Sequence, residues 1–143
     1  MKIARLSDRF LIKLEEVEIT IAPLSGRQKL EMTSMIKQGD DGKLYLDKIS
    51  QELFLIKHSV KSIKGLKDFD ESEYKLEFSG DELTEECADE LLGFLVNSYF
   101  TVANTQVMSG ILGEVINPIT GKAIRGISIE RAGSDGDEEK KSL

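Results

Sequence analysis

The longest apolar stretch of the chain runs from Leu83 to Leu112, and its hydrophobic positions follow a helical period. Thr84 can cap a helix there, because its hydroxyl can accept a hydrogen bond from a free N–H of the first turn. One stripe recurs at three- and four-residue steps: Ala88, Leu91, Leu92, Leu95, Tyr99, Val102 and Ala103. Three further apolar residues lie off that stripe: Phe94, Val96 and Phe100. A helix with two apolar faces is either central to a core or presents one face to a partner. Asn97 and Ser98 are weak helix formers, so two helices with a bend are an alternative.

The N-terminal part of the chain predicts two strands followed by a helix. Residues 10–14 and 17–21 are short apolar or β-branched runs, with Glu15-Glu16 between them as a tight turn or as part of one strand. Pro23 then ends the strand ladder, because it has no N–H to donate. From Gly26 to Gln38 the spacing of apolar residues predicts a helix, which the glycines of residues 39–42 break. Its methionines, Met32 and Met35, either fill the core or form an adaptable binding surface.

The middle of the chain allows two interpretations. Five apolar residues after Asp47 follow a helical period that would run to Lys64: Ile49, Leu53, Ile56, Val60 and Ile63. The alternative ends that helix near His58 and makes residues 59–63 a strand that pairs with residues 74–78, which alternate apolar and polar side chains. We favour this hairpin, because a strand needs a pairing partner and the neighbouring segment is the nearest one.

The whole pattern predicts a single α+β domain. Its elements are N-terminal strands, a short hairpin and about four helices, the longest near Thr84–Leu112, with a last short strand at Ile124–Ile129. Residues 1–129 form the expected globular domain, and residues 130–143 are expected to be a flexible charged tail, because they carry almost no apolar side chains.

Charge is distributed unevenly along the chain. The net charge is −7, yet residues 68–90 alone carry eleven acidic residues against one basic residue, Lys75. We call these residues the acidic block. It argues against nucleic acid as the partner of that surface, because phosphates would be repelled. The acidic block is either a solvated surface or an electrostatic guide for a basic partner.

No residue pattern in the sequence indicates catalysis, a metal or a cofactor. His58 is the only histidine and Cys87 the only cysteine, so the chain lacks the ligands of a His/Cys zinc site. The pair could act as base and nucleophile, but the carboxylates around Cys87 oppose thiolate formation. No calcium loop or phosphate loop fits the ligand spacing. No apolar run is long enough to span a membrane, so we expect a non-enzymatic protein of the cytoplasm.

Three segments together resemble the tail assembly chaperones of long-tailed bacteriophages. The first is Ile19–Ser25, where a strand ends at Pro23 before a helix. The second is Ser59–Asp68. The third, Tyr74–Thr84, leads into the long helical stretch. The resemblance covers the order of elements over about residues 10–112 and involves no catalytic signature.

The resemblance implies a cytoplasmic factor of the infected host cell that has no catalytic residues. Such a chaperone binds the tape-measure protein, and tail-tube subunits as a second client, before the tube polymerises; it binds neither nucleic acid nor membrane, and a weak homo-oligomer is compatible with it. Family members are often made in two lengths through a frameshift, and codons for Glu138–Lys141 could supply a slippery run. Phe94, Val96 and Phe100 are the candidate contacts with the partner. The alternative is a virion structural or adaptor protein, such as a tail-completion or connector subunit.

Overall fold

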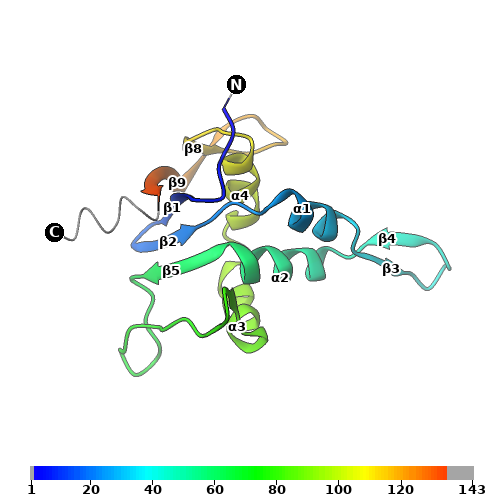
Figure 1. Ribbon diagram of the computed structural model, residues 1–143, viewed down its shortest axis with the longest axis horizontal. Coiled ribbons are helices and arrows are strands. Elements are labelled where there is room, and N and C mark those ends of the chain that lie inside the picture. Colours follow the sequence, from blue (N-terminus) through cyan, green and yellow to red (C-terminus); the bar gives the residue numbers. More distant parts are fainter. Residues whose placement is uncertain (1, 135–143) are drawn as a thin grey trace.

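The computed structural model describes residues 2–134 and has a mixed α+β fold, as the sequence predicts (Figure 1). Residues 135–143, which include most of the predicted tail and the proposed frameshift site, lie outside the described part. The elements in chain order are β1 (Asp8–Leu14), β2 (Val17–Ile21), α1 (Gly26–Thr33), β3 (Ile36–Gln38), β4 (Leu44–Leu46), α2 (Lys48–Ser59), β5 (Val60–Lys64), β6 (Phe78–Ser79), β7 (Glu82–Leu83), α3 (Glu85–Leu95), α4 (Phe100–Met108), β8 (Gly113–Ile116) and β9 (Ala123–Ser134).

A five-stranded antiparallel sheet in the order β5-β2-β1-β9-β8 supports the domain. The predicted N-terminal strands are β1 and β2, and a tight turn joins them: Glu15 has a φ of 52°, and its N–H donates to the Gly126 carbonyl at 2.9 Å. Along β2 the residues alternate between buried and half-buried, so the side chains of Ile19 and Ile21 point into the core.

The single longest helix expected near Thr84–Leu112 is not found: the stretch contains two helices, α3 and α4, divided at the bend that Asn97 and Ser98 suggested, and α2, with 12 residues, is longer than either. Thr84 caps α3 as predicted, because its hydroxyl accepts from the Cys87 N–H at 3.2 Å. The chain then turns, and Tyr99 adopts a left-handed φ of 62° just before α4. Both helices contribute to one hydrophobic core with the sheet.

The helix predicted over Gly26–Gln38 is too long. A capping box at Ser25 and Gln28 starts α1, but the helix ends at Thr33. Ile36–Gln38 instead form β3, which pairs with β4, and residues 39–42 form the loop of this hairpin. An apolar residue every few positions fits either a helix or a short strand, so the period alone does not separate them.

The hairpin predicted between residues 59–63 and 74–78 is half right. The helix α2 does end at Ser59 and a strand follows, but β5 pairs with β2. Residues 74–77 form no strand; the Tyr74 N–H donates to the Leu66 carbonyl at 2.7 Å, and only Phe78–Ser79 pair, with β7. Val60 and Ile63 are buried, and burial of apolar side chains against β2 outweighs proximity in sequence.

The predicted last strand is longer than expected. It runs as β9 to Ser134, beyond the predicted domain boundary at residue 129, and lies between β1 and β8, a strand that the sequence analysis missed. Near its end, the Arg131 guanidinium lies 3.1 Å from the carboxylate of Asp8. The first and last described strands are therefore joined by the ladder and by an ion pair.

Candidate functional site

The structure separates the three residues that the sequence grouped as partner contacts. Phe94 is 42 % exposed and Val96 is 54 % exposed, whereas Phe100 is 1 % exposed and belongs to the core. Phe100 is therefore a packing residue in this fold, and the prediction that it contacts a partner is corrected. The turn before α4 causes the difference, because it changes which side of the chain faces the sheet.

Phe94 lies beside a shallow hollow of about 380 Å³ between the end of α3, the β1–β2 turn and β9. Tyr99, predicted to lie on the core stripe, lines the same hollow and is 48 % exposed. Val96 is exposed but does not line it. The two exposed candidates thus remain accessible at the turn between α3 and α4.

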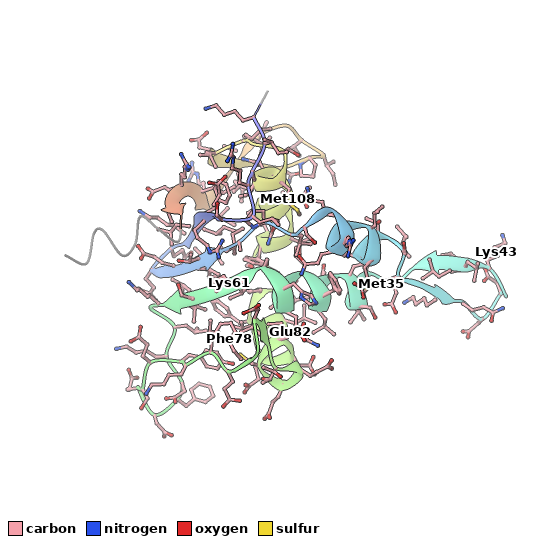
Figure 2. The ribbon with its side chains drawn as sticks, in the orientation of Figure 1. Met35, Lys43, Lys61, Phe78, Glu82 and Met108 are labelled. Carbon is pink, nitrogen blue, oxygen red and sulfur yellow. The ribbon has the colours of Figure 1, made fainter. Side chains whose placement is uncertain are left out.

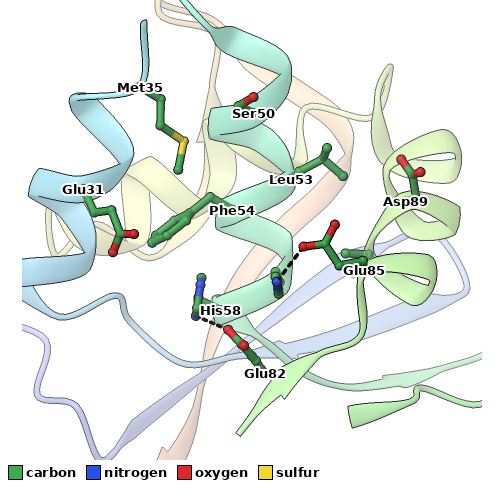
Figure 3. A pocket seen from close by; sticks show the side chains of 11 residues that line it. Glu31, Met35, Ser50, Leu53, Phe54, His58, Glu82, Glu85 and Asp89 are labelled. Carbon is green, nitrogen blue, oxygen red and sulfur yellow. Dashed lines mark hydrogen bonds and ion pairs between the residues drawn. The ribbon is translucent and has the colours of Figure 1, made fainter. Parts of the chain in front are cut away.

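A larger groove, which we call the α2 groove, has a volume of about 500 Å³ and lies between α1, α2, β7 and α3 (Figure 3). Its apolar lining comes from Met35, Leu53, Phe54 and Ala88. Four carboxylates line it as well: Glu31, Glu82, Glu85 and Asp89. Three of them belong to the acidic block, so the fold brings part of that block to an apolar surface.

Helix α2 positions the centre of the groove. Phe54 and His58 are four residues apart, so they lie on the same side of the helix, and their ring centroids are 4.2 Å apart. The helix is joined to both walls: His58 Nδ1 lies 3.4 Å from Gln28 Nε2 of α1, and Lys57 Nζ donates to Glu85 of α3 at 3.0 Å. These contacts hold the two walls on either side of the apolar lining.

The groove is negatively charged at neutral pH. Burial lowers the pKa of His58 below its ordinary value of 6.5, although the Glu82 carboxylate, 3.3 Å from Nδ1, opposes this shift. The hydrogen bond to Glu85 raises the pKa of Lys57, so Lys57 stays protonated. Glu31 and Asp89 have no ion-pair partner among residues 2–134. One cation therefore faces four carboxylates.

Cys87 does not line this groove. Its side chain is 1 % exposed, and its sulfur is 3.5 Å from the Tyr74 hydroxyl, whose pKa is raised mainly by burial. His58 lines the groove and Cys87 does not, so the groove does not bring base and thiol together. Within the described residues, no group of three His, Cys, Asp or Glu side chains is arranged to hold a metal ion.

The hairpin of β3 and β4, which we call the β-arm, is a feature that the sequence analysis missed. It projects from the body of the molecule, and every residue of its two strands is exposed (Figures 1 and 2). Figure 2 shows Met35 near the base of the β-arm and Lys43 toward its outer end. The Tyr45 hydroxyl donates to Asp41 within the β-arm. Met35 also lines the α2 groove, so the two features adjoin.

Comparison of the chain with protein-family models, with curated proteins and with solved structures finds no match. None of the helices in the described part of the chain has the length and apolar character needed to cross a membrane.

Proposed function

We propose that this chain is a non-enzymatic binding protein that acts as a tail assembly chaperone of a long-tailed bacteriophage in the host cell cytoplasm. Its client is the tape-measure protein, with tail-tube subunits as a second client. The α2 groove is the observation that supports this proposal best, because it combines an apolar lining with an excess of carboxylates.

The chemistry of the groove fits an amphipathic helix that carries Lys or Arg beside its apolar residues. Met35, Leu53 and Phe54 can receive the apolar side chains of such a helix. The Glu85 side chain is 90 % exposed, so a cationic side chain can reach it from solvent. Carboxylates without a partner repel one another, and a basic client relieves that repulsion on binding.

The function is tested by co-expressing the full chain with the tape-measure protein of the same genome, the long helical protein expected from the adjacent gene. We expect the tape-measure protein to stay in the soluble fraction and to co-purify with this chain only when the groove is intact. A tape-measure protein whose solubility is the same with and without the chain would overturn the proposal.

The groove itself is tested with Glu31→Lys combined with Asp89→Lys, because neither carboxylate has an ion-pair partner in the described structure. We expect this variant to fold and to lose the client. The matched control is Asp70→Lys with Glu77→Lys, which changes the net charge equally at exposed positions outside the groove. Equal retention of the client by both variants would remove the groove from the contact.

The alternative function, a virion structural or adaptor protein such as a tail-completion or connector subunit, is favoured by the β-arm. Projecting hairpins with free edges suit assembly between copies. Electron microscopy of the purified chain distinguishes the two functions: a stable closed ring supports the structural subunit, whereas a monomer or small oligomer that binds a long helical protein supports the chaperone.

A further inference from the structure

The β-arm is incomplete as an isolated element. It is a two-stranded sheet whose strands each have one unpaired edge within the described structure. Three aliphatic side chains lie on one face of it, because Ile36 pairs with Leu46 and Leu44 is two residues along: they are 55 %, 55 % and 66 % exposed, respectively. An isolated hairpin whose apolar face is more than half exposed is marginally stable in water, and pairing of its edge with a further strand stabilises it.

The backbone hydrogen bonds between β3 and β4 show which N–H and C=O groups of β4 are left without a partner inside the β-arm. The Gly39 N–H donates to the Lys43 carbonyl and the Asp47 N–H donates to the Met35 carbonyl, both at 2.9 Å. Along an antiparallel strand the backbone N–H and C=O groups of successive residues point alternately to one edge and to the other. Tyr45 lies two residues from both Lys43 and Asp47, so its backbone groups also point toward β3. The N–H and C=O groups of the residues between them, at positions 44 and 46, consequently point to the free edge of β4.

We propose that β4 pairs antiparallel with β4 of a second copy of this chain, about a two-fold axis at Tyr45. This register places Leu44 opposite the partner's Leu46, and Leu46 opposite the partner's Leu44, so that their free backbone groups form four hydrogen bonds. It also places Lys43 opposite the partner's Asp47, and Asp47 opposite the partner's Lys43. Tyr45 then meets the partner's Tyr45 in a pair without hydrogen bonds, where side chains approach most closely.

The strand is self-complementary in sequence, which is what a two-fold interface requires. Opposite charges occupy the two positions that flank the apolar centre at equal distance, Lys43 and Asp47. Asp47 caps α2 by accepting from the Ser50 N–H at 3.2 Å, and a carboxylate has further lone pairs with which to accept from a lysine. Pairing through β3 is disfavoured, because a two-fold axis at its middle residue would bring Lys37 against the partner's Lys37.

Pairing of the β-arms makes a four-stranded sheet with six aliphatic side chains on one face. The buried surface is small, so association depends on concentration: we expect monomer near about 1 µM and mostly dimer near about 200 µM. The two-fold axis closes the assembly at a dimer, so this pairing by itself builds no ring.

The experiment uses the full chain without any client. Sedimentation equilibrium between about 1 and 200 µM should report a monomer–dimer equilibrium. Leu44→Asp, which places a carboxylate in the apolar centre, should leave the chain monomeric throughout the range with an unchanged circular dichroism spectrum, because Leu44 is exposed. A monomeric wild-type chain at 200 µM, or a dimer that Leu44→Asp does not weaken, would overturn the proposal.

A disulfide tests the register directly. Tyr45→Cys should form a covalent dimer under mild oxidation, because Cα atoms in a pair without hydrogen bonds lie about 4.5 Å apart, within the range of a disulfide. The matched control is Lys37→Cys, its cross-strand neighbour on the same β-arm, which should stay monomeric. The native Cys87 is buried and is replaced by Ala in both variants. Equal cross-linking of the two variants would refute the β4 register.

Discussion

Phe94 and Phe100 are six residues apart and look alike in the sequence, yet they should respond very differently to truncation. Phe100 is 1 % exposed in the core between α4 and the sheet, whereas Phe94 is 42 % exposed beside the α3–α4 turn. Phe100→Ala removes a buried ring and leaves a cavity, which costs about 3–5 kcal/mol of unfolding free energy. Phe94→Ala removes a ring that is only partly shielded from water, so its cost should stay near about 1 kcal/mol.

Urea unfolding followed by circular dichroism measures this difference. For a slope of about 1.5 kcal/mol per molar, Phe100→Ala should lower the midpoint by about 2–3 M, and Phe94→Ala by less than about 1 M. The slopes should match that of the wild type, so that the midpoints report stability alone. Equal shifts for the two variants would refute the packing described for α3 and α4.

The same pair of variants separates stability from partner binding. Neither Phe94 nor Phe100 lines the α2 groove. The groove proposal therefore expects Phe94→Ala to stay folded and to retain the tape-measure protein in the co-expression assay. Loss of the client by folded Phe94→Ala would move the contact to the α3–α4 turn, where the sequence analysis put it.

Two further predictions concern the backbone and the pH dependence of stability. Gly65→Ala should lower the unfolding free energy by more than about 2 kcal/mol, because Gly65 has a φ of 87° and a Cβ there would collide with the Glu16 carbonyl. Gly93→Ala should instead raise the unfolding free energy by about 0.5–1 kcal/mol in the same urea assay, because Gly93 lies inside α3 with no atom near its Cβ position. Burial lowers the folded-state pKa of His58 below 6.5, so the unfolded chain takes up the proton first. The unfolding free energy should therefore be greatest above the ordinary histidine pKa of 6.5 and should fall as the pH is lowered below it, and His58→Gln should flatten this slope. An unchanged slope in His58→Gln would assign the dependence to other groups.

The sequence predicts best those elements whose signal is local. Short apolar or β-branched runs identified β1 and β2, and the capping hydroxyl of Thr84 identified the start of α3. Each of these patterns depends only on residues a few positions apart in the sequence. The β3–β4 hairpin was missed because Ile36 fits both the helical period and a strand, and its pairing with Leu46 depends on the loop between them.

The misplacement of Phe100 has a geometric cause. The stripe extrapolated from Ala88, Leu91 and Leu95 is correct within α3, because all three are buried. The turn at residues 96–99, with its left-handed Tyr99, resets the angular phase of the helix. After the turn Phe100 faces the core, and Tyr99, which the stripe placed inside, is half exposed. A phase change of this kind follows from one backbone conformation that side-chain periodicity does not encode.

The pairing of β5 and the composition of the α2 groove depend on tertiary structure. β5 follows α2 directly but pairs with β2, about forty residues earlier in the chain. The groove collects side chains from α1, α2 and α3, with Met35 at the base of the β-arm. Both methionines, Met32 and Met35, are half-buried rather than in the core, and Met35 lines the groove. A flexible thioether can adopt several shapes there.

The acidic block is not one surface with one role. Asp68 accepts hydrogen bonds from the N–H groups of Asp70 and Ser72 at 2.9 and 3.0 Å, so it organises its own loop. Glu90 accepts from the Tyr74 hydroxyl at 3.1 Å and so ties the loop to α3. Asp89, one residue away, has no such partner and lines the α2 groove instead. Of the four groove carboxylates, Glu85 pairs with Lys57 and Glu82 lies 3.3 Å from His58 Nδ1, so Glu31 and Asp89 are the two without a partner in the described structure. Under the proposed function, a basic client would form its new ion pairs with these two carboxylates.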